Sequence, residues 1–150
     1  LQVYFLHHRF AGQIEIMNSK KGVIQDRTIY EDVEIFARNL HQMQYMTDRD
    51  WKTYKDLFKN MTQFLRKPDL IIYLRASTDT LLSRIKNRDR DFEKDISPEY
   101  LHSLNIAYDK WIDRCNDHEV LTINSDDFNI FEDKKGLQNI LVQIGSSLSK

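Results

Sequence analysis

Asp69-Leu70-Ile71-Ile72-Tyr73-Leu74 is the stretch that decides the fold. Its apolar run shows neither the three-and-four spacing of a surface helix nor the strict alternation of a half-exposed strand. A run of this kind is typical of a strand buried on both faces, as in parallel sheets. We therefore expect this strand to lie inside a parallel sheet whose other strands come from distant parts of the chain.

The segments on both sides of this strand predict alternating helices and strands. Two further short apolar runs, at 23–26 and 119–124, predict strands. Helical spacing of apolar residues, together with capping signals at Thr28, Thr47, Ser77 or Asp79, and Ser97, predicts helices over 1–17, 28–46, 47–65, 77–85, 97–112 and 137–148. Strands separated by helices imply parallel crossovers, so the fold class is α/β, in one continuous domain over residues 1–150.

Composition argues against nucleic-acid and membrane partners. The 150 residues carry 22 Lys and Arg against 23 Asp and Glu, a formal charge of −1, so no basic excess attracts phosphate backbones or anionic lipids. No apolar run approaches the roughly 18 residues that a membrane helix needs. A single cysteine, Cys115, cannot form an internal disulfide, and this predicts a reducing, cytoplasmic compartment.

Charged side chains gather at two places where phosphates could bind. Asp26 ends a predicted strand and Arg27 follows it, at the sheet edge where ligands of such folds bind; an acid there can hold a hard cation and an arginine can clamp a phosphate. Three arginines lie close together at the C-terminal end of a predicted helix and just beyond it: Arg84, Arg88 and Arg90. Their positive charges suit the binding of a polyphosphate. Taken singly, the first pair equally fits a salt-bridged turn, and the second group fits a solvated helix end neutralised by nearby acids.

Two predicted helices carry polar and aromatic groups suited to a heterocyclic base. Gln2 and Arg9 lie two turns apart on one helix, and Asp32 and Phe36 lie one turn apart on another. An amide, a guanidinium and a carboxylate can bond a base edge, and an aromatic ring can stack on its face. For Phe36 alone, a place in the hydrophobic core is the simpler interpretation.

Taken together, these clusters resemble the deoxyribonucleoside kinases in order and spacing, closest to the deoxycytidine, deoxyadenosine and deoxyguanosine kinase branch. The resemblance covers essentially the whole chain and rests on the segments Gln2-x6-Arg9, 26–32, Arg84-x3-Arg88-x-Arg90-x2-Glu93 and 126–128. It implies a P-loop kinase-like, three-layer architecture. It also implies transfer of the γ-phosphoryl group of ATP, or another nucleoside triphosphate, with Mg²⁺ to the 5′-hydroxyl of a deoxyribonucleoside in nucleotide salvage.

The resemblance also implies a role for each matched residue on the nucleoside side. Gln2 bonds the base edge, Arg9 and Asp32 form a charged pair against its polar face, Phe36 stacks on the base, and Glu93 reaches the sugar 3′-hydroxyl. Within the family, thymidine-accepting relatives carry apolar residues at the positions of Arg9 and Asp32. A guanidinium can donate to purine N7 and a carboxylate can accept from an exocyclic amine, which favours a purine without excluding cytosine.

On the phosphate side, the resemblance implies that Asp26 holds Mg²⁺ and that Arg27 contacts the 5′-oxygen and orients the general base. Arg84, Arg88 and Arg90 belong to a lid that closes over the phosphates, and Arg84 also packs on the donor base. Asp127 and Phe128 line that base. Relatives pair through helices matching 1–17 and 28–46, so a homodimer is expected.

Two parts of the family pattern are absent from these residues. No Gly-x-x-x-x-Gly-Lys-[Ser/Thr] motif occurs, and the glutamate that serves the family as catalytic base has no counterpart. Both precede the matched region in the family, so we expect a fragment that lacks N-terminal strands and is inactive alone. Three alternatives stay open: a thymidylate-type nucleotide kinase, a non-catalytic kinase-like regulatory subunit, and nucleic-acid binding through the lid.

Overall fold

The computed structural model describes residues 1–93, 95–126 and 128–149. They form two compact units, Leu1–Lys67 and Pro68–Lys150. The expected single domain over 1–150 stays a prediction. Across the described residues, every helix is too short or too polar to cross a bilayer.

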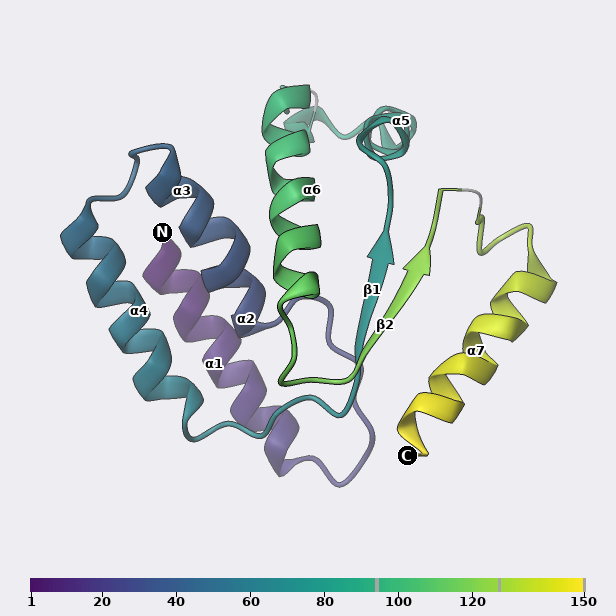
Figure 1. The fold of residues 1–150 in the computed structure, drawn as a ribbon, viewed down its shortest axis with the longest axis horizontal. Coiled ribbons are helices and arrows are strands. Elements are labelled where there is room, and N and C mark those ends of the chain that lie inside the picture. The colour runs from purple at the N-terminus through teal and green to yellow at the C-terminus, as the bar shows by residue number, and fades with distance from the viewer. Residues whose placement is uncertain (94, 127, 150) are drawn as a thin grey trace. The chain divides into compact units, whose positions relative to one another are not determined.

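The first unit is helical. Helix α1 spans Gln2–Asn18 and α4 spans Asp48–Thr62; between them, α2 (Ile29–Glu31) continues through a π-helical segment, η1 (Asp32–Ala37), into α3 (Arg38–Gln42) (Figure 1). The predicted capping box is present at Thr28 and Glu31, and the Thr47 side chain accepts a hydrogen bond from the Asp50 backbone N–H. Because such caps satisfy backbone groups that the first turn leaves unpaired, they fix where these helices begin.

Apolar side chains from these helices form the core of the first unit. Leu6, Ile29, Val33, Ala37 and Tyr54 are buried together. Partly buried residues pack around them: Phe10, Tyr30, Met46, Trp51, Phe58, Met61 and Leu65. The three- and four-residue spacing read from the sequence therefore marks the buried faces in part: Leu6 and Tyr54 are buried, whereas Val3, Met17 and Phe64 on the same predicted stripes are exposed.

The second unit contains two parallel strands with helices around them. Strands β1 (Ile71–Arg75) and β2 (Val120–Asn124) pair in parallel, with Ile71 opposite Val120. Between them the chain forms α5 (Thr78–Arg88), a 3₁₀ turn η2 (Asp91–Glu93) and α6 (Pro98–Asp113), and α7 (Lys134–Leu148) follows β2 (Figure 1). Ser77, rather than Asp79, caps α5. The α/β fold class and the parallel pairing are confirmed.

The strand predicted at 23–26 is wrong. These residues lie outside any strand, and Ile24 is 97% exposed. A strand needs a partner to complete its backbone hydrogen bonds, and within the described ranges the sheet contains β1 and β2 alone. Side chains of α1 hold the segment instead, since Gln13 donates to Gln25 Oε1 at 2.5 Å and Arg9 donates to the Asp26 carbonyl at 3.4 Å.

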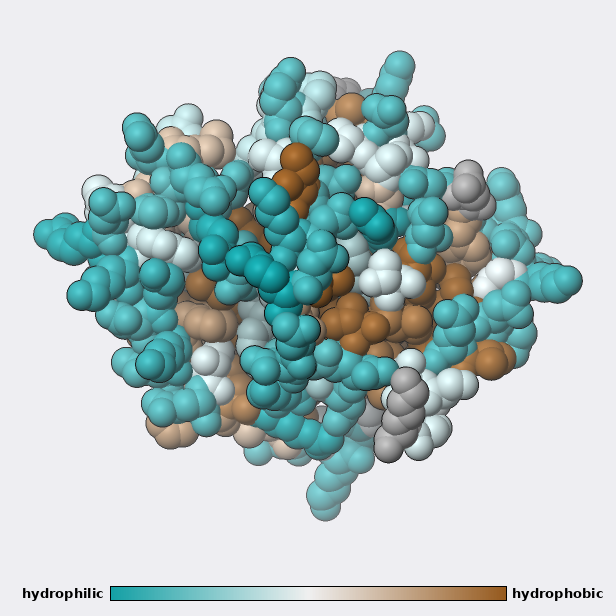
Figure 2. Space-filling model, in the orientation of Figure 1, coloured by the Kyte–Doolittle hydropathy of each residue, from teal (hydrophilic) through white to brown (hydrophobic). Residues whose placement is uncertain are grey.

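The expected burial of β1 on both faces is also wrong. Tyr73 and Arg75 point toward α6, where both contact Asp109. Ile72 and Leu74, which alternate with them on the strand, are 37% and 62% exposed. Figure 2 shows hydrophobic surface over the two strands and beside α7. The apolar run thus marks a strand with one covered face and one open face among the described residues.

Candidate active site

Five of the predicted site residues come together in the first unit. Arg9 Nε lies 3.8 Å from Asp32 Oδ2, and Arg9 Nη1 donates to the backbone carbonyl of Asp26. The Arg27 guanidinium carbon lies 5.1 Å from the centre of the Phe36 ring. The structure therefore brings together the Arg9–Asp32 ion pair, the backbone of Asp26 and the Arg27–Phe36 contact, which sequence spacing alone left as separate pairs.

The local backbone explains how these side chains meet. Asp32 and Phe36 both belong to η1, and π-helical segments of this kind, rare elsewhere, are frequent at functional sites. Arg27 has a φ of 61°, a left-handed conformation that is costly for a residue with a side chain. This turn directly precedes the capping box at Thr28 and Glu31, so the chain reverses sharply between Asp26 and the helix.

Burial dominates the electrostatics of Asp32. The residue is 4% exposed, and desolvation raises the pKa of its carboxyl; Arg9 and Arg27 oppose this shift, while Glu31 adds to it. Its Oδ2 atom makes no hydrogen bond. A buried carboxylate with spare acceptor capacity beside a guanidinium can receive a donor group from a ligand.

Gln2 and Tyr54 line a cavity of about 400 Å³ in the same unit, together with Met46 and Leu57. The Gln2 Oε1 atom and the Tyr54 hydroxyl are both buried without a hydrogen-bond partner. Burial and the nearby charge of Asp32 raise the pKa of Tyr54. Sequence spacing placed Tyr54 within an apolar stripe, and its ring does belong to the core. The spacing therefore gave no sign that its hydroxyl lines a polar part of the cavity.

Replacing the Tyr54 hydroxyl by hydrogen (Tyr54→Phe) is expected to raise the free energy of unfolding by about 1 kcal/mol, since an unpaired buried hydroxyl is removed. Urea denaturation measures the change. Tyr73→Phe is the matched control: the Tyr73 hydroxyl donates to Asp109 Oδ1 at 3.1 Å, so its loss is expected to lower stability by a similar amount, about 1 kcal/mol. Destabilisation by Tyr54→Phe would show instead that this hydroxyl has a partner in solution.

In the second unit, the predicted lid residues divide between two groups. Arg88 Nη2 lies 2.9 Å from Glu93 Oε2, and Arg90 Nη1 lies 3.6 Å from Glu93 Oε1. Helix α5 ends at Arg88, and the capping residue Asp89, with a left-handed φ of 47°, turns the chain toward η2 and brings Glu93 back to the arginines. The contact of Glu93 with a sugar hydroxyl stays a prediction.

Arg84 lies apart from this group and contacts the loop that follows β2. Its guanidinium donates to Ser125 Oγ at 3.1 Å, to the Ser125 carbonyl, and to the Phe128 carbonyl at 3.4 Å. The expected neighbourhood of Arg84 and Phe128 is therefore present. Asp127, which we expected beside Phe128, lies outside the described residues.

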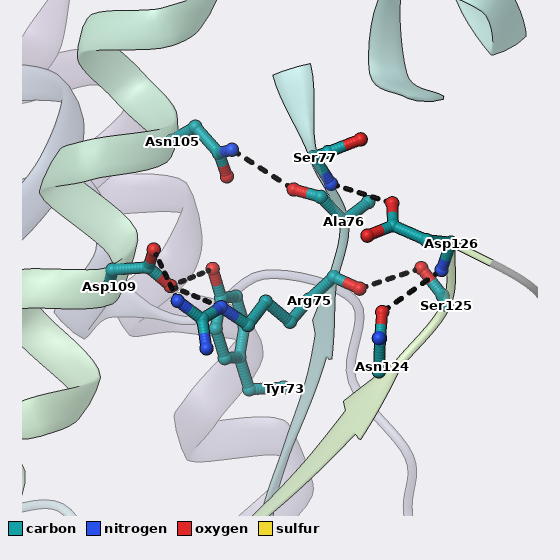
Figure 3. Close-up of polar contacts among 9 residues, drawn as sticks. All are labelled: Tyr73, Arg75, Ala76, Ser77, Asn105, Asp109, Asn124, Ser125 and Asp126. Carbon is teal, nitrogen blue, oxygen red and sulfur yellow. Dashed lines mark hydrogen bonds and ion pairs between the residues drawn. The ribbon is translucent and has the colours of Figure 1, made fainter. Parts of the chain in front are cut away.

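A second cavity, of about 460 Å³, lies at the carboxyl ends of the two strands and includes Arg75, Asn105, Asp109 and Asp126 in its lining. Figure 3 shows how these groups are held: Arg75 pairs with Asp109 Oδ1 at 3.1 Å, and Asn105 Nδ2 donates to the Ala76 carbonyl at 3.0 Å. Sequence reasoning missed Asp109 because it lies on α6, 34 residues from Arg75.

The acidic side chains fit a magnesium ion shared with phosphates better than one enclosed by protein. In the part of the chain that the structure describes, no three His, Cys, Asp or Glu side chains gather around one point. Asp26 stands alone as the proposed metal ligand. Mg²⁺ in kinases is commonly held by one or two carboxylates together with substrate phosphates and water, so a single carboxylate fits this role.

Comparison with known proteins gives a consistent result. Residues 1–149 match the deoxynucleoside kinase family. The deoxyadenosine kinase of Dictyostelium discoideum is 45% identical over 129 residues, covering 85% of this chain and 52% of that protein. The deoxyadenosine/deoxycytidine kinase of Bacillus subtilis (strain 168) is 37% identical over 148 residues, covering 97% of this chain and 68% of that protein.

Solved structures agree in fold. The structure of deoxyadenosine kinase from M. mycoides with the products dCMP and a flexible dCDP bound matches with a TM-score of 0.82 and 30% identity, over 97% of this chain and 72% of that one. The same kinase with bound dATP matches with a TM-score of 0.77 and 30% identity, over 93% and 72%. This chain spans about half the length of the Dictyostelium relative and about 70% of the solved kinase.

Proposed function

This chain belongs to the deoxynucleoside kinase family, and from that premise we propose that it serves the transfer of the γ-phosphoryl group of ATP to the 5′-hydroxyl of a deoxyribonucleoside in nucleotide salvage. The relatives include kinases named for deoxyadenosine, deoxyguanosine and deoxycytidine. Phosphoryl transfer depends on positioning and on charge neutralisation more than on covalent chemistry. A site made of arginines and acids suits that demand.

The observation that carries the nucleoside assignment is the pair formed by Arg9 and the buried Asp32 next to Phe36. The carboxylate can accept from the exocyclic amine of adenine, and the guanidinium can donate to a ring nitrogen. Gln2, two helical turns from Arg9 on α1, adds a buried amide oxygen without a hydrogen-bond partner. We propose a purine preference, deoxyadenosine or deoxyguanosine, with Phe36 stacking on the base and Glu93 bonding the 3′-hydroxyl.

Around the transferred phosphoryl group, the proposal assigns Asp26 to Mg²⁺, Arg27 to the 5′-oxygen of the nucleoside, and Arg88 and Arg90 to the phosphates of the donor. Mg²⁺, when bound, screens the phosphate oxygens and orients them for in-line transfer. The paired state of Arg88 and Arg90 with Glu93 supports a lid, since a segment rich in charge with few buried apolar contacts can open locally. Arg84, Asp127 and Phe128 are assigned to the donor base.

The proposed assembly is a homodimer. Helix α1 carries exposed apolar side chains that suit contact with a second copy: Val3, Tyr4, Phe5 and Met17. The predicted helix over 28–46 adds the exposed Met43 and Tyr45, whereas its residues Val33, Ile35 and Ala37 are buried within the unit.

The proposal is tested by initial rates with deoxyadenosine, deoxyguanosine, deoxycytidine and thymidine, using MgATP and the longest natural form of the protein. We expect phosphorylation of a purine nucleoside at the highest kcat/KM. A preference for thymidine would contradict the roles of Arg9 and Asp32. Activity on thymidine monophosphate alone would favour a nucleotide kinase, and failure with every acceptor would favour a regulatory subunit.

A further inference from the structure

Ser125 fastens the loop after β2 to the end of β1. Its backbone N–H and its hydroxyl both donate to the Arg75 carbonyl, at 2.8 and 2.9 Å (Figure 3). The residue is only 6% exposed, although it lies at a strand end. Two bonds from one residue to one carbonyl leave the start of the loop little freedom to move away from β1.

Ser125 also determines how Arg84 is presented. Nη1 of Arg84 donates to the Ser125 hydroxyl, and Nη2 donates to the carbonyls of Ser125 and Phe128. The edge of the guanidinium that carries these nitrogens is therefore turned toward the loop. What Arg84 offers to a ligand is its planar face, which suits stacking on an aromatic base better than clamping a phosphate.

Asp126 makes a second connection, to the first turn of α5. Its Oδ1 accepts the Ser77 backbone N–H at 2.7 Å (Figure 3). The Ser77 side chain caps the same helix by accepting the Thr80 backbone N–H. The hydrogen bond from the Ser77 N–H lowers the pKa of the Asp126 carboxyl. The backbone N–H of Asp126 in turn donates to Asn124 Oδ1 at 3.1 Å, so the backbone of this residue is held by the end of β2 as well.

We infer that Ser125 and Asp126 are positioning residues for the nucleotide donor: by joining the loop to β1 and to both ends of the Ser77–Arg84 segment, they hold the Arg84 guanidinium face and Phe128 ready for the donor base. The inference rests on the proposed function and adds to it two residues without a direct contact to the donor. If these bonds persist during lid closure, the first part of α5 and the loop after β2 move together.

Asp126→Ala tests the connection, because it removes the acceptor for the Ser77 N–H. A loop that holds its binding conformation only part of the time binds more weakly in proportion, and we expect about a tenfold higher dissociation constant for MgATP by calorimetry. Asp126→Asn keeps a carbonyl acceptor and is expected to stay within about threefold of the wild type. In the rate assay, the KM for ATP rises while the KM for the deoxynucleoside changes little.

Thr47→Ala is the matched control. Thr47 also accepts a backbone N–H at the start of a helix, that of Asp50 in α4 at 3.2 Å, so its loss removes a similar bond in the other unit. Stability should fall, but MgATP affinity should not. Equal losses of affinity in Asp126→Ala and Thr47→Ala would overturn the inference, because they would indicate general destabilisation.

Amide hydrogen exchange at Ser77 reports the connection without any turnover. Exchange should be faster in Asp126→Ala than in the wild type and in Asp126→Asn. Unchanged exchange, or faster exchange with unchanged MgATP affinity, would overturn the inference. A wild type that binds MgATP but phosphorylates no acceptor would refute the proposed function alone, and the calorimetric comparison would still decide the role of Asp126.

Discussion

Replacing Arg9 with methionine (Arg9→Met) is expected to lower the free energy of unfolding by about 3 kcal/mol near pH 8. The Asp32 side chain is 6% exposed and its ion pair with Arg9 is the charge interaction that compensates its burial most. Removing one partner of a buried pair leaves an uncompensated charge, which costs more than the pair itself contributes. Methionine keeps most of the side-chain volume, so the change isolates the charge.

The loss of stability in Arg9→Met depends on pH, because protonation of Asp32 removes the buried charge that causes it. Desolvation raises the pKa of Asp32 above 3.8, and Arg9 is the strongest opposing cause. A carboxyl with a raised pKa in the folded state adds stability below its unfolded pKa, and that stability is lost as the pH rises through the folded pKa. Without Arg9 the folded pKa rises further. Urea unfolding should therefore show a larger effect of Arg9→Met near pH 8 than near pH 5.

Two further variants separate charge from packing. Arg9→Met combined with Asp32→Asn should recover about 2 kcal/mol near pH 8, because no charge is then buried. Arg49→Met breaks a pair with Asp50 of similar length, 3.6 Å, whose side chains are 89% and 55% exposed, and it should change stability by less than about 1 kcal/mol. An Arg9→Met effect that is equal at both pH values would show that lost packing, rather than charge, is responsible.

Those parts of the fold that depend on local chemistry follow from the sequence. Thr28, Thr47 and Ser97 each accept a hydrogen bond from the backbone two or three residues ahead, so the signal for a helix start lies within a few residues. The strand expected at 23–26 depends instead on a distant partner, and an apolar run carries no information about whether that partner is present. The prediction that Ile72 and Leu74 are buried is wrong for the same reason, since their burial depends on which distant segments cover the sheet.

The candidate site divides in the same way. The pairing of Arg9 with Asp32 could be anticipated, because the resemblance linked residues that lie 23 positions apart. No spacing rule finds the bonds from Ser125 to Arg75, 50 residues away, or from Asp126 to Ser77, 49 residues away. Tyr54 escaped for a different reason: a tyrosine on an apolar helical stripe looks like core from the sequence, and only its buried, unpaired hydroxyl distinguishes it.

Arg27→Met is expected to lower kcat by roughly 10²- to 10³-fold, the usual cost of removing a positioned donor that stabilises developing charge. Its guanidinium now lies over the Phe36 ring, directly after the proposed metal ligand. The Arg27→Gly variant should lose activity equally but be more stable than Arg27→Met by about 1 kcal/mol, because glycine adopts the φ of 61° without the steric cost of a side chain. Single-turnover rates and urea unfolding measure the two effects separately.

Gln44 provides the matched control, because it has the same φ of 61° and lies two residues beyond the end of α3, at a position with no proposed catalytic or binding role. Gln44→Gly should also raise stability by about 1 kcal/mol while leaving kcat unchanged. If both glycine variants gain stability but only Arg27→Gly loses activity, then the strained backbone at residue 27 is retained because the Arg27 side chain is needed for catalysis. If Arg27→Gly and Arg27→Met keep wild-type kcat, then Arg27 has no part in phosphoryl transfer, and its strained turn serves only to direct the chain into the capping box at Thr28.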